Sequence, residues 1–143
     1  MYMYEFIQNI NKENQINLED ITNIEQKYDV IFPKELVEFL IHYNGSEIYL
    51  SQIIGKDGVK YEISSLIPIK YGLMSMEKMM EWDRMDGFVK PSRIPIANDR
   101  GGNAYYLDVE SGEILLYFGE NIENPKVICL NFDEMLRNIY RIV

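Results

Sequence analysis

The sequence has little of the chemistry on which most active sites depend. It contains one cysteine, Cys129, and one histidine, His42. A lone cysteine cannot form an internal disulfide, and without further cysteines or histidines no zinc site of ordinary composition can be assembled. A Ser-His-Asp or Cys-His arrangement would have to use His42, which falls on a helix beside core-facing residues. We therefore expect no catalytic set, no metal site and no cofactor, and a reducing, cytoplasmic compartment.

Long apolar runs are also missing. No window approaches the ~20 apolar residues of a membrane-spanning helix. The first ten residues include Glu5 and have no basic segment. We expect neither a membrane span nor a secretion signal.

Basic residues are few relative to acidic ones. The chain has 14 Lys and Arg against 23 Asp and Glu, which gives a net charge of −9. Phosphate contacts need clustered Lys and Arg, so we expect no direct nucleic-acid binding. An acidic surface would speed encounter with a basic partner protein, although solubility alone also accounts for this charge.

The residues that remain suit a globular core, because 47% of the 143 are hydrophobic. Apolar residues at three- and four-residue spacing predict four helices. These are Leu18–Asp29, a helix that starts at Pro33 and ends at Asn44-Gly45, Met76–Met85, and a C-terminal helix after Asn131. Asn17, Ser75 and Asn131 are the expected N-caps. The stripe of the first helix is Leu18, Ile21, Ile24 and Tyr28, and that of the last is Phe132, Met135, Leu136, Ile139 and Val143.

Strands are predicted where β-branched and aromatic residues concentrate between turn signals. The predicted strands are Glu47–Ile54, Val59–Ile69, a short strand from Ile94, Ala104–Val109, Ile114–Phe118 and Lys126–Leu130. Asn121–Pro125 is expected to be a loop, and residues 1–10 a short helix or an edge strand. The predicted fold is α+β in a single domain, 1–143: a curved, mostly antiparallel sheet with an N-terminal helical hairpin, one inserted helix and a C-terminal helix.

Partner contacts are predicted from loop and strand-end placement and from aromatic content. The chain has 11 tyrosines and one tryptophan, residue types that dominate interface energetics. Apolar residues of the Met76–Met85 helix cover more than one stripe, and we interpret its methionines as core filling rather than an adaptable contact surface. The glycines of Arg100-Gly101-Gly102 suit a turn, since the phosphate-loop ending is missing. The predicted contacts are Glu47, Tyr49, Trp82, Asp83, Asp86, Asp99 and Arg100.

Two blocks resemble a known family. They are IEQKYDVIFPKELVEFLIHYNG, at 24–45, and IPIANDRGGNAYYLDVESGEILLYFGE, at 94–120. Phe32-Pro33, Asn44-Gly45 and the Ile94–Asn103 segment look like the motifs of the SUKH superfamily, which includes yeast cell-wall-synthesis regulators and many bacterial proteins. The resemblance implies an α+β fold and, in bacteria, an immunity protein that binds and neutralises a cognate secreted toxin, often a nuclease.

Two other functions stay open beside the immunity hypothesis. One is a regulatory scaffold like the yeast proteins, and the other is a hydrolase that uses carboxylates around Asp99. For an immunity protein we expect a monomer, although an exposed sheet edge could pair weakly with a second copy.

Overall fold

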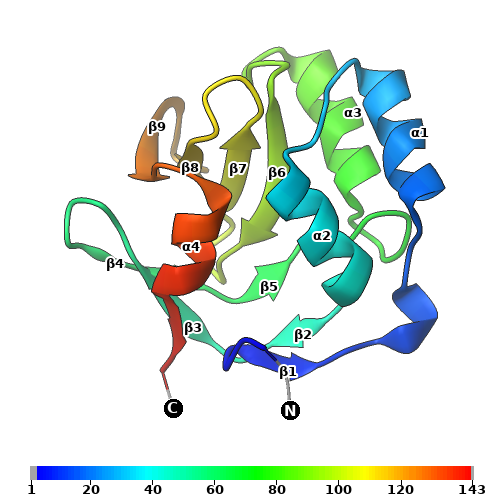
Figure 1. The fold of residues 1–143 in the computed structure, drawn as a ribbon. Coiled ribbons are helices and arrows are strands. Elements are labelled where there is room, and N and C mark those ends of the chain that lie inside the picture. The colour runs from blue at the N-terminus through cyan, green and yellow to red at the C-terminus, as the bar shows by residue number, and fades with distance from the viewer. Residues whose placement is uncertain (1–2, 143) are drawn as a thin grey trace.

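The computed structural model describes residues 3–142, which form four α-helices, a short 3-10 helix and ten strands (Figure 1). The helices are α1 (Leu18–Tyr28), α2 (Lys34–Tyr43), α3 (Met76–Asp86) and α4 (Phe132–Asn138), with the 3-10 helix η1 at Lys12–Asn14. Within this described range no helix is both long and apolar enough to cross a membrane.

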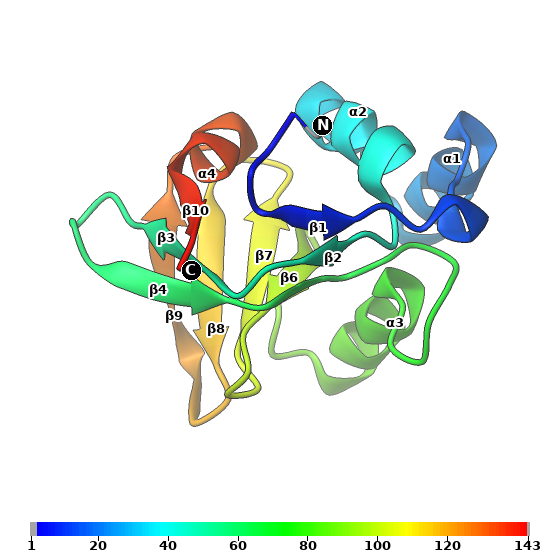
Figure 2. The same ribbon diagram turned by 90° about the horizontal axis from the view of Figure 1, so that it is seen from below.

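The strands form three antiparallel sheets. The largest has the order β5-β6-β7-β8-β9, with a three-stranded sheet β10-β3-β4 and a pair β1-β2 beside it. The strand bounds are β1 (Ile7–Asn9), β2 (Glu47–Ile48), β3 (Ser51–Ile54), β4 (Lys60–Ile63), β5 (Ser65–Leu66), β6 (Arg93–Asn98), β7 (Ala104–Asp108), β8 (Ile114–Phe118), β9 (Asn121–Cys129) and β10 (Ile139–Arg141). Figure 2 shows α2 and α4 on one face of the largest sheet and α3 beside β6. The predicted α+β class is confirmed.

Local signals set both ends of α1 and the start of α2. The Asn17 side chain accepts a hydrogen bond from the Asp20 N–H at 3.0 Å, and the Asp20 carboxylate accepts one from the Asn17 N–H at 3.0 Å, a complete capping box. The first helix ends at Asp29, whose φ of 54° is left-handed. Pro33 is the N-cap of α2, so this helix starts one residue later than predicted. Leu18 is 63% exposed and lies off the buried stripe, which corrects its assignment.

Long-range pairing divides the predicted strands differently from the sequence pattern. The expected strand at 47–54 breaks into β2 and β3, because β2 pairs with β1 while β3 pairs with β4 and β10. The expected strand at 59–69 ends at Leu66 and bends at Ser64, whose N–H binds the Asn98 carbonyl at 2.9 Å. The expected loop at 121–125 is wrong, since β9 already begins at Asn121 and pairs with β8.

The C-terminal end also differs from its prediction. Asn131 caps α4 by accepting a hydrogen bond from the Glu134 N–H at 2.8 Å, as expected. The helix then ends at Asn138, and Ile139 enters β10, where it pairs with Ile53. The helical assignment of Ile139 is therefore wrong, and Val143 lies outside the described residues.

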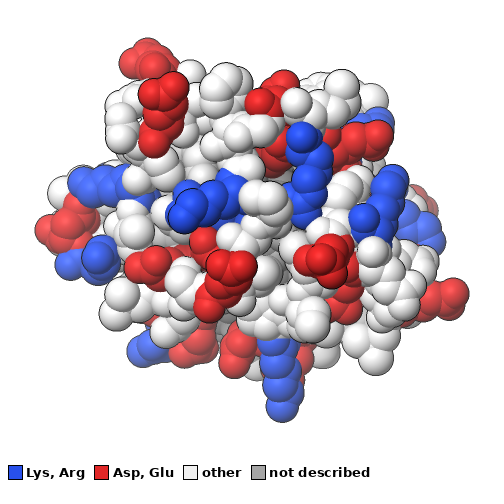
Figure 3. Space-filling view, turned by 90° about the horizontal axis from the view of Figure 1, so that it is seen from above, with Lys and Arg blue, Asp and Glu red and all other residues white. Residues whose placement is uncertain are grey.

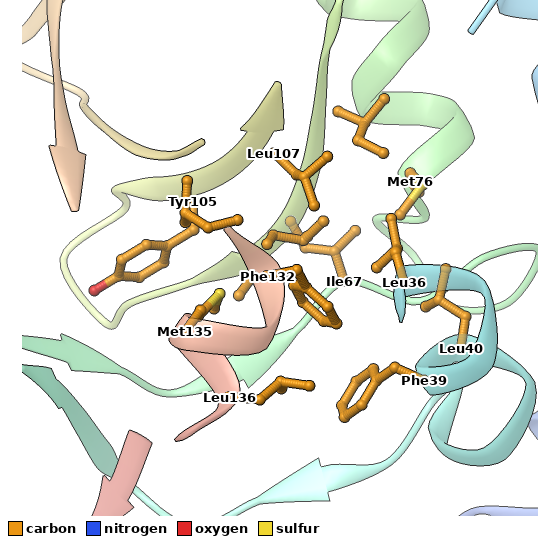
Figure 4. Close-up of a cluster of buried hydrophobic side chains, with 14 of the residues drawn as sticks. Leu36, Phe39, Leu40, Ile67, Met76, Tyr105, Leu107, Phe132, Met135 and Leu136 are labelled. Carbon is orange, nitrogen blue, oxygen red and sulfur yellow. The ribbon is translucent and has the colours of Figure 1, made fainter. Parts of the chain in front are cut away.

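The main core lies between the largest sheet and helices α2 and α4. Figure 4 shows Leu36, Phe39 and Leu40 of α2 and Phe132, Met135 and Leu136 of α4 converging with Tyr105 and Leu107 of β7. The opposite sheet face carries a smaller buried cluster of Val89, Tyr106, Leu115 and Tyr117. Strand β8 is therefore covered on both faces, as its apolar sequence predicts.

The Asn44-Gly45 pair ends α2 and fastens it to the chain around it. Asn44 is 2% exposed, and its amide donates to the carbonyls of Asn14 and Ile69 at 2.8 and 3.0 Å. The Ile69 N–H donates back to Asn44 Oδ1 at 2.8 Å. Gly45 has φ +74°, and a Cβ there would lie 2.5 Å from Asn14 Cβ, so glycine is required by both conformation and space.

Candidate interaction surface on helix α3

Helix α3 has a buried face and an exposed apolar face. Ser75 caps its start by accepting from the Lys78 N–H at 3.4 Å, and Gly87 ends it with φ 75°. Met76 and Met80 are buried against the sheet. Trp82 and Met85, three residues apart and so neighbours on the helix surface, are 55% and 79% exposed.

Phe88, just after the helix, is 59% exposed and extends the apolar character of this end. We define the α3 surface as Trp82, Met85 and Phe88 with the exposed carboxylates of Glu81 and Asp86. Aromatic and methionine side chains are enriched at protein–protein interfaces, so these three exposed residues make this end of α3 a candidate contact surface. Of the predicted contacts, Trp82, Asp83 and Asp86 lie together here.

The α3 surface rests on fixed internal contacts. Arg84 donates to the carbonyls of Tyr28 and Pro91 at 2.7 and 3.1 Å, which ties the end of α3 to α1 and to the following segment. Asp83 turns inward and accepts a hydrogen bond from the Tyr106 hydroxyl at 2.7 Å. Burial, with the charge of Asp86, raises the pKa of Asp83 against the opposing effect of that hydrogen bond. Asp83 therefore anchors the helix, and its predicted partner contact stays a prediction.

Charge at this end of the molecule is mixed. In Figure 1 the end of α3 and the segment leading to β6 lie at the top, and Figure 3 views the molecule from that side. Lys and Arg side chains form an interrupted band among Asp and Glu side chains. The acidic excess of the chain is therefore not concentrated into a uniform patch on this side.

Glu47 and Tyr49 lie on a different part of the molecule from α3. Glu47 is exposed on β2 and accepts a hydrogen bond from the Asn9 amide at 3.3 Å. The Arg141 guanidinium lies 4.1 Å from the centroid of the Tyr49 ring. In Figure 1, β2 is at the bottom of the view and the end of α3 is at the top, so one small partner surface would not cover both.

Asp99 and Arg100 form the turn between β6 and β7. Asp99 Oδ1 accepts from the N–H groups of Gly101 and Asn103 at 2.8 and 2.9 Å, and Oδ2 accepts from the Asn103 amide at 2.8 Å. Arg100 binds both carboxylate oxygens of Glu62 at 3.0 Å. The turn follows β6, a six-residue strand about 20 Å long, so it lies far from the end of α3.

The same turn offers little to a carboxylate-based hydrolase. A general acid needs a carboxyl group whose pKa is raised towards neutrality. The hydrogen bonds from Arg100 instead lower the pKa of Glu62. His42 is exposed on α2, with Nδ1 2.9 Å from the Glu38 carbonyl oxygen. Over residues 3–142, no group of three or more His, Cys, Asp or Glu is placed to hold a metal ion.

Sequence reasoning missed part of the α3 surface. Met85 was assigned to core filling, and Phe88 and Glu81 were not selected as contacts. A signal was present: Met76 and Met80 define one face at four-residue spacing, and Trp82 and Met85 cannot share it. Apolar residues on the second face of a short helix indicate either burial on both sides or a surface left for a partner.

Comparison with known proteins adds a family match. The family model of the SMI1 / KNR4 family (SUKH-1) matches residues 15–138. This range includes all four α-helices and the complete five-stranded sheet. Among curated proteins, no sequence matches the chain.

Proposed function

Because the chain belongs to the SMI1 / KNR4 family (SUKH-1), we propose that it is an immunity protein. In this role it binds a cognate secreted toxin inside the cell and neutralises it by protein–protein contact. The family resemblance associates bacterial members with this role. The net charge of −9 suits a basic toxin, such as a nuclease domain, because opposite fields raise the association rate.

The exposed apolar α3 surface is the observation that carries this proposal. Trp82 and Phe88 are rigid aromatic side chains of the kind that anchor interfaces, and Met85 adapts to an irregular partner surface. Arg84 and Asp83 hold the helix in place, so little ordering is needed on binding. The carboxylates of Glu81 and Asp86 border the apolar residues and suit the Lys and Arg side chains of a nuclease.

The experiment pairs this protein with a toxin encoded beside its gene. Co-expression should restore growth, and the two proteins should co-purify. A W82A/M85A variant should weaken the complex by at least about 30-fold, the equivalent of about 2 kcal/mol for truncating an interface anchor. The control is L130A, because Leu130 is 55% exposed, as Trp82 is, but lies at the end of β9.

Three outcomes separate the parts of the proposal. Growth arrest despite expression of this protein would reject the pairing with that toxin. Rescue that survives W82A/M85A unchanged would keep the immunity function and reject the α3 surface as its contact. A gene without a toxin neighbour, with housekeeping proteins as its specific partners, would favour the regulatory scaffold instead.

A further inference from the structure

A groove runs between α2 and α4 on a surface separate from α3. Two adjoining hollows form it, of about 450 and 220 Å³, and both are lined by Glu35 of α2 and Asp133 of α4. The smaller hollow is also lined by Tyr4, Phe39 and Tyr43. Both hollows are open to solvent. Figure 1 shows α2 and α4 side by side on one face of the molecule.

The groove has aromatic walls. The Tyr4 ring centroid lies 5.9 Å from that of Phe39 and 5.7 Å from that of Tyr43, and Phe39 and Tyr43 are 5.0 Å apart. Aromatic faces attract cations through the ring quadrupole, and a planar guanidinium can also stack on them. Phe39 is buried, whereas the Tyr4 and Tyr43 rings are partly exposed.

Carboxylates surround these rings. Glu35, Glu38 and Asp133 all line the smaller hollow. Glu38 is 3.9 Å from Lys34, and Asp133 is 3.0 Å from Arg137. These are exposed i,i+4 pairs, which contribute little and can be exchanged for another cation. Among residues 3–142 the Glu35 carboxylate has no ion-pair partner.

Charge and aromatic character together select the occupant. Tyr4, Tyr43, Glu35 and Asp133 all line the smaller hollow, so the rings and the carboxylates face the same space. Burial, with the neighbouring Tyr43 and Asp133, raises the pKa of the Tyr4 phenol. A neutral apolar side chain would leave the Glu35 carboxylate without an ion-pair partner, and an anion would meet three carboxylates in the smaller hollow. A guanidinium suits both the rings and the carboxylates of the groove, because it stacks on aromatic rings and binds carboxylates through two parallel hydrogen bonds.

We propose that the groove between α2 and α4 binds an arginine side chain presented by a partner protein. The guanidinium lies against Tyr4 and Tyr43 and pairs with Glu35 and Asp133. This inference goes beyond the proposed function, because it identifies a recognition site that does not depend on a toxin or on the α3 surface.

The test is a two-dimensional NMR titration without any toxin. The probe is the peptide acetyl-Gly-Arg-Gly-amide, and its citrulline analogue is the neutral control of the same shape. The arginine peptide should shift amide signals of α2 and α4, and the citrulline peptide should not. An E35Q/D133N variant should weaken binding about fivefold, whereas E81Q/D86N, with the same charge change on α3, should bind as the parent protein does.

Two variants of Tyr43 test how much its aromatic ring contributes to binding of the arginine peptide. Tyr43→Leu removes the aromatic face and should weaken binding, while Tyr43→Phe should retain it. Equal binding of the arginine and citrulline peptides would overturn the proposal, as would full binding by E35Q/D133N. Groove signals that shift with protein concentration in the absence of peptide would also overturn it, because a second copy of the chain would then be the occupant.

Discussion

Replacing Asn44 with alanine tests how the fold is held together at its Asn-Gly pair. The side chain is buried and makes three hydrogen bonds, to the Asn14 carbonyl and to the carbonyl and N–H of Ile69. A hydrogen bond contributes about 1 kcal/mol net, and a buried group left without a partner costs about 1–3 kcal/mol. Alanine would leave three backbone groups without this partner, so we expect N44A to lower the free energy of unfolding by about 3 kcal/mol.

Urea unfolding followed by circular dichroism measures this loss at equilibrium. The matched control is N23A, because Asn23 is exposed on α1 and its replacement should change the free energy by less than about 0.5 kcal/mol. The slope of the transition should stay the same in both variants, since neither changes the surface exposed on unfolding. A loss below about 1 kcal/mol for N44A would refute the reasoning, because water would then be replacing the amide at little cost.

Three further predictions concern other parts of the chain. D108N should lower the free energy of unfolding at pH 7 by about 3 kcal/mol, because it leaves the guanidinium of Arg93, 14% exposed and 3.0 Å from Asp108, without its charge partner. Burial would raise the pKa of Asp108, but hydrogen bonds from Arg93 and the backbone lower it overall. The difference in the free energy of unfolding between D108N and the parent protein is thus present above the ordinary carboxyl pKa. It should shrink as pH falls through the pKa of Asp108 in the folded protein. An unchanged difference in acid would contradict this. Burial, with the charge of Glu134, raises the pKa of the Cys129 thiol to about 12, so Ellman's reagent should react only after urea unfolding, and equally fast reaction of the native protein would refute it. Stopped-flow association with a basic toxin should slow markedly when ionic strength rises roughly tenfold, and a rate independent of salt would indicate apolar recognition alone.

The helices could be predicted from sequence because their signals are local. Asn17 and Asp20 form a capping box within four residues, and the apolar spacing of α1 and α2 identifies their buried faces. The Asn44-Gly45 stop was predicted for the same reason. The buried hydrogen bonds of the Asn44 side chain were not predicted, because both partners of its amide, Asn14 and Ile69, are distant in sequence.

The strand boundaries depend on partners that the local pattern does not contain. Nothing within 47–54 separates the part that pairs with β1 from the part that pairs with β4. Asn121–Pro125 has the composition of a loop and becomes a strand because β8 is available beside it. Ile139 continues the apolar stripe of α4, yet it extends into β10 to pair with Ile53. Tertiary pairing overrides local propensity in each case.

Charged residues chosen as contacts illustrate a second limit of sequence reasoning. The sequence does not show whether a charged residue is already bound within the fold, in which case a partner has to displace that contact. Asp99 closes its own turn, Arg100 binds Glu62, and Asp83 binds Tyr106. The Asp-x-Gly spacing of Asp99 and Gly101 is a local signal for the first of these, since an aspartate carboxylate often accepts the N–H two residues on. The other two pairings need the fold.

Helix α3 shows why composition should be read face by face. Taken as a whole its apolar residues indicate core filling, and for Met76 and Met80 the structure agrees. Trp82 and Met85 point the other way and stay exposed, which leaves them available to a partner. The α3 surface and the α2–α4 groove differ accordingly in chemistry. The first presents apolar anchors, and the second presents aromatic rings with carboxylates, so a partner that uses both must carry an apolar patch and an arginine on separate parts of its surface.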